Sequence, residues 1–243
     1  MKDSPIRHTI NRLCASCLLG GAAAVFSSPP LFAGEPADSA AVECDSLRYR
    51  TLTPDDYKTV AAELDIPVAA IRAVVEIEAG ARGEGFNGDN TPIINFDLTM
   101  FRQAARRRGI NLSKYEKKYP VVFQPLNRKK YGSTQAAQYA RLDAAMKIDT
   151  VAALEGTFWG MFQIGGFNWK ICGCSSVKEF AHLMGRSELD QLELFGKFLQ
   201  SRGLDKYIRN RQWSQFALRY NGPGYRKRSY DSRIAAAFAR YSK

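Results

Sequence analysis

Apolar residues recur at helical spacing along most of the chain after residue 53, and this pattern predicts a mainly α-helical protein. The predicted helices cover residues 53–64, 67–79, 134–148, 151–164, 177–184, 187–201, 210–220 and 229–241. Between the second and the third, a glycine-rich segment precedes a short apolar run at 93–96, which predicts one or two short strands. We therefore expect a helical domain with a small β element near residues 85–100.

The helix predicted over 67–79 carries a glutamate, Glu78, on its apolar face. Three residues at helical spacing share that face: Ile71, Val74 and Val75. Burial disfavours a carboxylate, and so does the negative end of the helix dipole, so we expect a raised pKa and a proton donor of the kind that a glycosidase requires. Glu76 lies on the other side of the same helix, beside Arg72, where we expect it to be solvated.

The composition indicates one sizeable domain that is attracted to an anionic partner. The chain has 243 residues, 45% of them hydrophobic, and a formal net charge of +11. Nucleic acid, anionic lipid and the bacterial cell wall all fit that charge. A basic stretch at 102–130 contains Tyr115, Tyr119 and Phe123 among its cations. This mixture suits a sugar chain or single-stranded nucleic acid, and it also fits an irregular solvated insertion.

The N-terminus has the form of a bacterial export signal. Lys2, Arg7 and Arg12 precede an apolar run, and cleavage is expected after Ala33 or after Ala24. The predicted organisation is a signal peptide at 1–33, a flexible arm at 34–52 and one domain at 53–243. No later stretch reaches the length needed to cross a bilayer, so we expect a periplasmic or secreted protein without stable membrane insertion.

The cysteines point to a disulfide rather than to a metal. In an oxidising compartment, Cys44 is expected to pair with Cys172 or Cys174. The close spacing of those last two cysteines does not match zinc motifs, and the sequence holds only two histidines. We therefore expect no metal and no cofactor. We also expect the protein to be a monomer.

Three separated segments resemble one known pattern. They are Ala-Val-Val-Glu-Ile-Glu at 73–78, Trp-Gly-Met-Phe-Gln-Ile at 159–164 and Tyr-Asn-Gly-Pro-Gly-Tyr at 220–225. In this order they resemble the lysozyme superfamily, as in goose-type lysozymes and soluble lytic transglycosylases. The chain is more closely similar to the N-acetylmuramidase domain of certain phage endolysins and related bacterial proteins, over most of residues 67–241.

The resemblance implies a lysozyme-like fold with a saccharide cleft, and it implies roles for individual residues. Glu78 falls on the catalytic glutamate of the family, although the serine that commonly follows it is Ala79 here. Other positions fall on residues that bind the substrate: Met161, Phe162, Gln163, Tyr220 and Asn221. The phenol of Tyr220 would orient the acid or simply pack in the core, and the amide of Asn221 would bind an N-acetyl group.

The second acid is left open by the sequence. Asp97 replaces a glutamate that is usual in close relatives, and Thr99 stands where they have a histidine. Glu155 is the other candidate for a catalytic task. Each of these carboxylates also suits a plain helix or turn contact. Some goose-type enzymes tolerate a weak or absent second acid, so the chemistry can depend chiefly on Glu78.

The expected activity is hydrolysis of the β-1,4 bond between N-acetylmuramic acid and N-acetylglucosamine in the glycan strands of peptidoglycan. A lytic transglycosylase, which forms 1,6-anhydromuramic products, is the alternative within the same fold. A non-catalytic wall-binding protein is an alternative from another class. A nucleic-acid partner is not expected, because that reading explains neither a core-facing glutamate nor an export signal.

Overall fold

The computed structural model describes residues 51–79, 84–124 and 134–243. The predicted signal peptide, most of the predicted arm and Cys44 therefore lie outside the described residues. Within them, Cys172 and Cys174 are buried free thiols, and burial raises the pKa of each to about 12.

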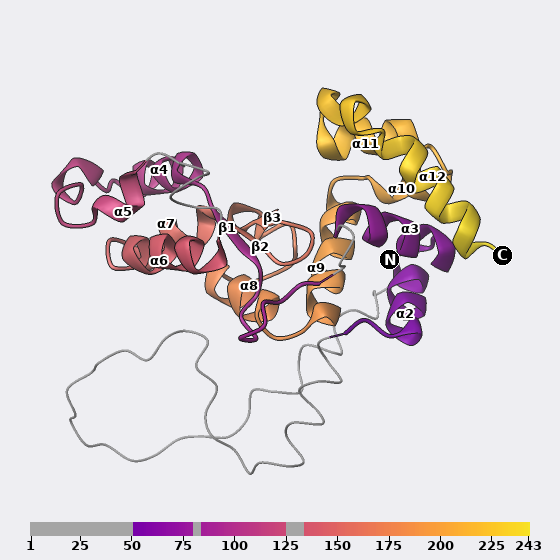
Figure 1. Cartoon of the computed structure of the whole chain (residues 1–243), viewed down its shortest axis with the longest axis horizontal. Coiled ribbons are helices and arrows are strands. Elements are labelled where there is room, and N and C mark those ends of the chain that lie inside the picture. Colours follow the sequence, from indigo (N-terminus) through magenta and orange to yellow (C-terminus); the bar gives the residue numbers. More distant parts are fainter. Residues whose placement is uncertain (1–50, 80–83, 125–133) are drawn as a thin grey trace, which may run out of the picture. The chain divides into compact units, whose positions relative to one another are not determined.

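The described part is mainly α-helical, as the sequence predicts (Figure 1). Its α-helices are α2 (Pro54–Leu64), α3 (Val68–Glu78), α4 (Leu98–Arg107), α5 (Pro120–Phe123), α6 (Gln135–Met146), α7 (Thr150–Glu155), α8 (Val177–Met184), α9 (Glu188–Ser201), α10 (Asp205–Arg209), α11 (Trp213–Asn221) and α12 (Tyr230–Tyr241). Short 3₁₀ turns are η3 (Leu112–Lys114), η4 (Gly166–Asn168) and η5 (Pro223–Arg228). None of these described helices combines the length and the apolar character that a membrane span needs.

The β element is larger than its prediction. One strand, β1 (Ile94–Phe96), lies in the expected region, beside an isolated bridge between Phe86 and Pro92. Two further strands, β2 (Thr157–Trp159) and β3 (Ile164–Gly165), complete an antiparallel sheet of order β1-β2-β3. The helix predicted over 151–164 is therefore wrong after Glu155. Thr157, Phe158 and Trp159 are residues that favour strands, and they pair with β1.

The basic stretch begins in a helix that the pattern did not predict. Helix α4 buries Phe101, Ala104 and Ala105 and exposes its arginines, so the first part of the stretch is a packed element rather than an irregular insertion. Residues 125–130 of the stretch lie outside the described residues. Helix α10 was also missed, because five residues are too few to show a period.

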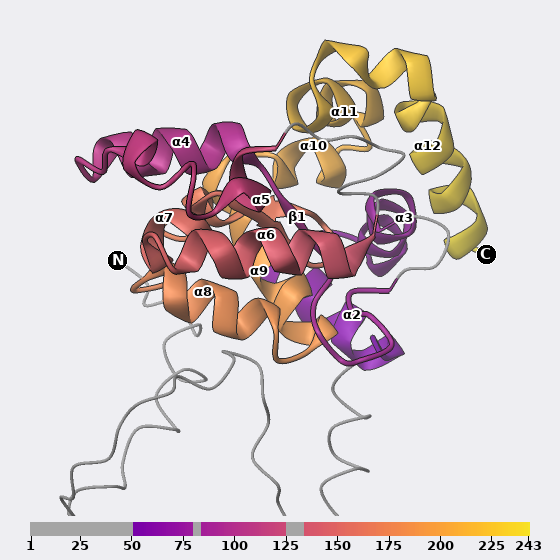
Figure 2. The same cartoon turned by 60° about the vertical axis from the view of Figure 1, so that its left-hand side comes forward.

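The site is supported by two sets of packed helices. Helix α3 packs along α12 and also contacts α2 and α10, and Figure 2 shows α3 beside α12. Helix α9 supplies a fully buried stripe of Leu192, Phe195 and Leu199, which recur at helical spacing. Since α9 contacts both α2 and α8, it joins the helix before α3 to the helix that follows the sheet.

Candidate active site

Glu78 is the last residue of α3, and its carboxyl group is largely withdrawn from water. Asn221, the last residue of α11, donates a hydrogen bond from Nδ2 to Glu78 Oε1 over 3.1 Å. Burial raises the pKa of Glu78 to about 7, although the Asn221 hydrogen bond and the positive charge of Arg233 both act to lower it. This direction agrees with the raised pKa expected from the sequence, and it makes a protonated Glu78 available near neutral pH.

Glu76 lies at the surface with its side chain 34% exposed, in line with the solvated position expected from the sequence, but it is also paired with α12. Arg240 forms an ion pair with its Oε1, and the Tyr241 hydroxyl donates to Oε2 over 2.8 Å. Burial alone would raise the pKa of Glu76, but these hydrogen bonds outweigh burial and lower it. Arg72, its expected neighbour, instead lies over the ring of Tyr241, 4.2 Å from the ring centre.

Tyr220 links the segment at 220–225 to the segment at 159–164. Its hydroxyl donates to the backbone oxygen of Phe162 over 3.3 Å, and its ring stacks on Phe216. Burial, followed by the nearby charge of Glu78, raises the pKa of Tyr220 well above its usual value. Tyr220 is therefore half-buried and has one hydrogen-bonded hydroxyl, and it lies close enough to Glu78 for that charge to affect its pKa.

The Gly-Met-Phe-Gln motif forms the turn between β2 and β3. Gly160 and Gln163 both have positive φ angles, +68° and +48°, and Gln163 Nε2 donates to the Gly160 oxygen over 2.8 Å. The side chains of Met161 and Phe162 are only 4% exposed, and Phe162 stacks on Phe195 with ring centres 4.1 Å apart. In this structure Met161 and Phe162 are buried, while Gln163 keeps partial access to solvent.

Gln191 of α9, which sequence reasoning missed, ties this turn to the segment that follows Glu78. Its buried Oε1 accepts from the Met161 N–H over 2.8 Å, and Nε2 donates to the oxygens of Met184 and Gly85. A Cβ on Gly85 or Gly160 would lie 2.4 or 2.6 Å from Gln191 Oε1, so both glycines are needed for this approach. A polar residue inside the apolar stripe of α9 was the available signal.

Glu188 supports the same segment from one helical turn earlier on α9. Its Oε1 accepts from the Gly85 N–H over 2.8 Å, and its Oε2 accepts from the Leu52 N–H over 3.2 Å. The two polar side chains of α9 therefore fix both the backbone near Gly85 and the turn that carries Gln163.

A pocket of about 490 Å³ begins at the residue after Glu78. It is lined by Ala79, Glu84, Phe86, Asn87, Gly88, Ile93 and Gln135. Gln135 holds the edge of β1, since its amide exchanges hydrogen bonds of 2.9 and 3.0 Å with the Ile94 backbone. The ring of Phe86 and the amides of Asn87 and Gln135 suit a saccharide. This pocket is therefore a candidate sugar-binding subsite next to Glu78.

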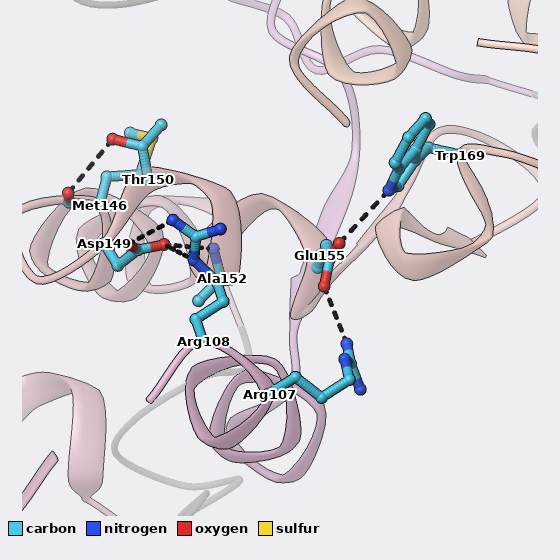
Figure 3. A network of polar contacts seen from close by, with 8 residues as sticks. All are labelled: Arg107, Arg108, Met146, Asp149, Thr150, Ala152, Glu155 and Trp169. Carbon is cyan, nitrogen blue, oxygen red and sulfur yellow. Dashed lines mark hydrogen bonds and ion pairs between the residues drawn. The ribbon is translucent and has the colours of Figure 1, made fainter. Parts of the chain in front are cut away.

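The two candidates for a second acid are engaged elsewhere. Asp97 caps α4, where its Oδ1 accepts from the Met100 N–H over 2.9 Å. Glu155, at the end of α7, accepts from Arg107 over 2.8 Å and from the indole N–H of Trp169 over 3.3 Å (Figure 3). Among the described residues, no hydrogen bond or ion pair joins either carboxylate to Glu78 or Asn221.

Comparison with known proteins identifies the family of this chain. A family model described as N-acetylmuramidase matches residues 67–242. The chain belongs to the N-acetylmuramidase family. The crystal structure of Burkholderia AP3 phage endolysin is similar to it, with 37% identity and a TM-score of 0.70, over 79% of this chain and 72% of that one. No curated protein matches.

Membership in the N-acetylmuramidase family makes this chain a glycoside hydrolase of peptidoglycan. It confirms the resemblance inferred from the three motifs and the lysozyme-like, mainly α fold. Glu78, Gln163, Tyr220 and Asn221 all lie within the matched range.

Proposed function

We propose that this N-acetylmuramidase hydrolyses the β-1,4 bond between N-acetylmuramic acid and N-acetylglucosamine, with Glu78 as the general acid. The observation that carries the proposal is the pKa of Glu78, which burial raises to about 7 beside a pocket. A glycosidase acid must be protonated near the working pH and must face the glycan.

The immediate contacts of Glu78 suit both halves of a proton transfer. Before the transfer, burial keeps the carboxyl group neutral. When the proton passes to the leaving oxygen, the new carboxylate keeps the hydrogen bond from Asn221 and the attraction of Arg233. These two interactions are stronger with the charged form, so they stabilise the transition state more than the ground state. The bond between the anomeric carbon and the leaving oxygen breaks as that oxygen takes the proton. Water then bonds to the oxocarbenium-like carbon and releases one proton to the solvent, from which Glu78 is protonated again.

The decisive experiment replaces the acid by its isosteric amide. Glu78→Gln should abolish turbidity clearance of purified cell walls and the release of reducing ends, because it keeps the shape and loses the proton. Glu76→Gln is the matched control, since the same change on the same helix should leave clearance intact. Retained clearance by a Glu78→Gln protein with a native circular dichroism spectrum would contradict the role of Glu78.

A second carboxylate is not needed in this proposal. Asp97→Asn should keep activity within about twofold of the wild type, because asparagine caps a helix as well as aspartate does. Glu155→Gln should also keep activity within about twofold of the wild type when the substrate is glycan from which the peptides have been removed. A loss of about 100-fold or more in either folded variant would instead identify the missing acid or base.

The product distinguishes hydrolysis from the alternative chemistry of a lytic transglycosylase. In that reaction the muramic 6-hydroxyl replaces water, and the product is lighter by one water. Mass spectrometry of the released muropeptides should show the hydrated product.

Export by the segment at 1–33 is a separate proposal. N-terminal sequencing of the mature protein tests it, and the mature protein should start after Ala33 or after Ala24.

A further inference from the structure

A second pocket of about 400 Å³ lies outside the candidate active site. Its lining comes from α4, from the end of α7 and from the segment that follows β3. The lining residues are Met100, Gln103, Arg107, Glu155, Phe167, Trp169 and Lys170. The proposed reaction uses none of these residues.

The polar groups of this pocket are held in place by fixed contacts. The Glu155 carboxylate joins Arg107 of α4 to the indole of Trp169, and its side chain is 17% exposed (Figure 3). Beside it, Arg108 binds both oxygens of Asp149, at 2.8 and 3.0 Å, and so fixes the end of α4 against α7. A pocket whose walls are held this way is preorganised for a ligand.

The charges of the pocket favour an anionic ligand. Its single carboxylate is already bound to Arg107, which uses one of its five N–H donors on it. Lys170 lies over the Trp169 ring at 5.1 Å, and no carboxylate in the described ranges forms an ion pair with it. Phe167 is 40% exposed and adds an apolar surface. A neutral sugar would leave Lys170 without an anionic partner, whereas an acidic peptide supplies carboxylates together with apolar groups.

The pocket lies at the open end of the hairpin whose turn carries Gln163. Glu155 precedes β2 and Phe167 follows β3, while residues 160–163 close the other end. From Gly156 to Gly160 the strand advances roughly 13 Å, at about 3.3 Å per residue. An extended peptide of about four residues spans a similar distance. A peptide attached to a sugar at the turn is therefore long enough to reach the pocket.

We propose that this pocket binds the acidic peptide stem carried by the muramic acid of peptidoglycan, with Lys170 and Arg107 contacting its carboxylates. This inference rests on the proposed function, because it takes the glycan to lie along the turn at 160–163. The pocket would then give the enzyme a preference for glycan that still carries peptides.

The test compares two forms of the same polymer. Wild type and Lys170→Gln are assayed on intact peptidoglycan and on glycan strands whose peptides have been removed by an amidase. Lys170→Gln should lower kcat/KM about fivefold on the intact polymer, since a charge-assisted contact is lost, and should match the wild type on stripped strands. Arg106→Gln is the control, because it removes one exposed charge from α4 next to the pocket but outside its lining.

The outcomes separate this inference from the proposed function. An equal loss on both polymers, no loss on intact peptidoglycan, or the same loss in Arg106→Gln would overturn the peptide site, while cleavage of stripped strands by the wild type would still support the muramidase. A wild type that cleaves neither polymer would contradict the proposed function itself.

A binding measurement needs no catalysis. A synthetic acidic stem peptide is titrated into the Glu78→Gln protein, and the NMR signal of the Trp169 indole N–H is followed. A saturable shift that is lost when Lys170→Gln is added supports the site. The absence of a shift at millimolar peptide would refute it.

Discussion

At the scale of the residue, two glutamates on one helix show that surroundings rather than residue type decide the chemistry. Burial raises the pKa of Glu78 to about 7, whereas hydrogen bonds from Tyr241 and Arg240 lower that of Glu76. The helical period predicts the first result from nearby residues. It cannot predict the second, because Arg240 and Tyr241 lie more than 160 residues along the chain.

The pH dependence of the rate should report Glu78 directly. Activity should fall as the pH rises through about 7, because the acid then loses its proton. Arg233 lowers the pKa of Glu78, so Arg233→Gln should move this alkaline limb to higher pH, by roughly a few tenths of a pH unit since Arg233 is exposed and screened. The measurement is kcat/KM between pH 5 and 9 at constant ionic strength, because this ratio reports the pKa of the free enzyme.

Arg240→Gln is the control for that profile, since it removes the same charge from the same helix beside Glu76. Its alkaline limb should stay where the wild type has it. An equal displacement in both variants would mean that the limb reports net charge rather than Glu78.

The same pKa predicts a cost in stability at high pH. The folded protein binds the Glu78 proton more tightly than the unfolded chain does, because the pKa rises from 4.5 to about 7 on folding. Its contribution to stability is therefore fully present below about pH 4.5 and is lost as the pH rises through 7. The wild type should lose on the order of 3 kcal/mol of its free energy of unfolding between pH 4 and pH 8, and Glu78→Gln should not show this loss. Denaturant unfolding of both proteins at the two pH values measures this loss, and a difference between them that is independent of pH would contradict the buried acid.

At the scale of the element, most helices and the region of β1 were predicted, whereas α4, α10 and the strands β2 and β3 were not. The helix over 177–184 has the predicted bounds, because its apolar period is local. The segment 157–165 contains residues that also fit a helical period, but Trp159 pairs with Ile94 on a strand far away in the sequence. Such pairing depends on tertiary contacts that a local pattern does not contain. The same holds for the site. Glu78 was predicted from the local helical pattern, whereas the role of Gln191 depends on tertiary contacts and was not predicted.

Gln191 should matter for both stability and rate. Gln191→Leu removes the acceptor of the buried Met161 N–H, which should lower the free energy of unfolding by about 1–3 kcal/mol. It should also lower kcat at temperatures where the variant is folded, because the turn that carries Gln163 loses its anchor. Gln200→Leu on the exposed side of α9 is the matched control and should change kcat little. Unchanged kcat in a folded but destabilised Gln191→Leu protein would limit Gln191 to a structural role.

At the scale of the whole molecule, the sequence predicts the family and the charge but not how the charges are used. Three motifs in order were sufficient for the family, since each lies in a segment that the fold brings to one site. The arginines of α4 looked alike in the sequence. All four arginines at 102, 106, 107 and 108 are exposed, but Arg107 and Arg108 bind carboxylates, whereas Arg102 and Arg106 form no ion pair within the described residues. Only tertiary contacts make that distinction.

The whole chain has a net charge of +11, which becomes +9 once the proposed signal peptide at 1–33 is removed. This positive charge should hold the enzyme on an anionic wall, and the attraction should weaken with salt. Clearance of walls should slow as NaCl rises from about 20 to 500 mM, where the Debye length falls from about 20 to about 4 Å. Lys227 and Arg228 are exposed on η5 and form no ion pair within the described residues, so their double replacement by glutamine should leave the fold intact and reduce the salt dependence. Co-sedimentation with purified walls separates binding from turnover. Salt-independent binding by both proteins would show that the wall is held by other contacts.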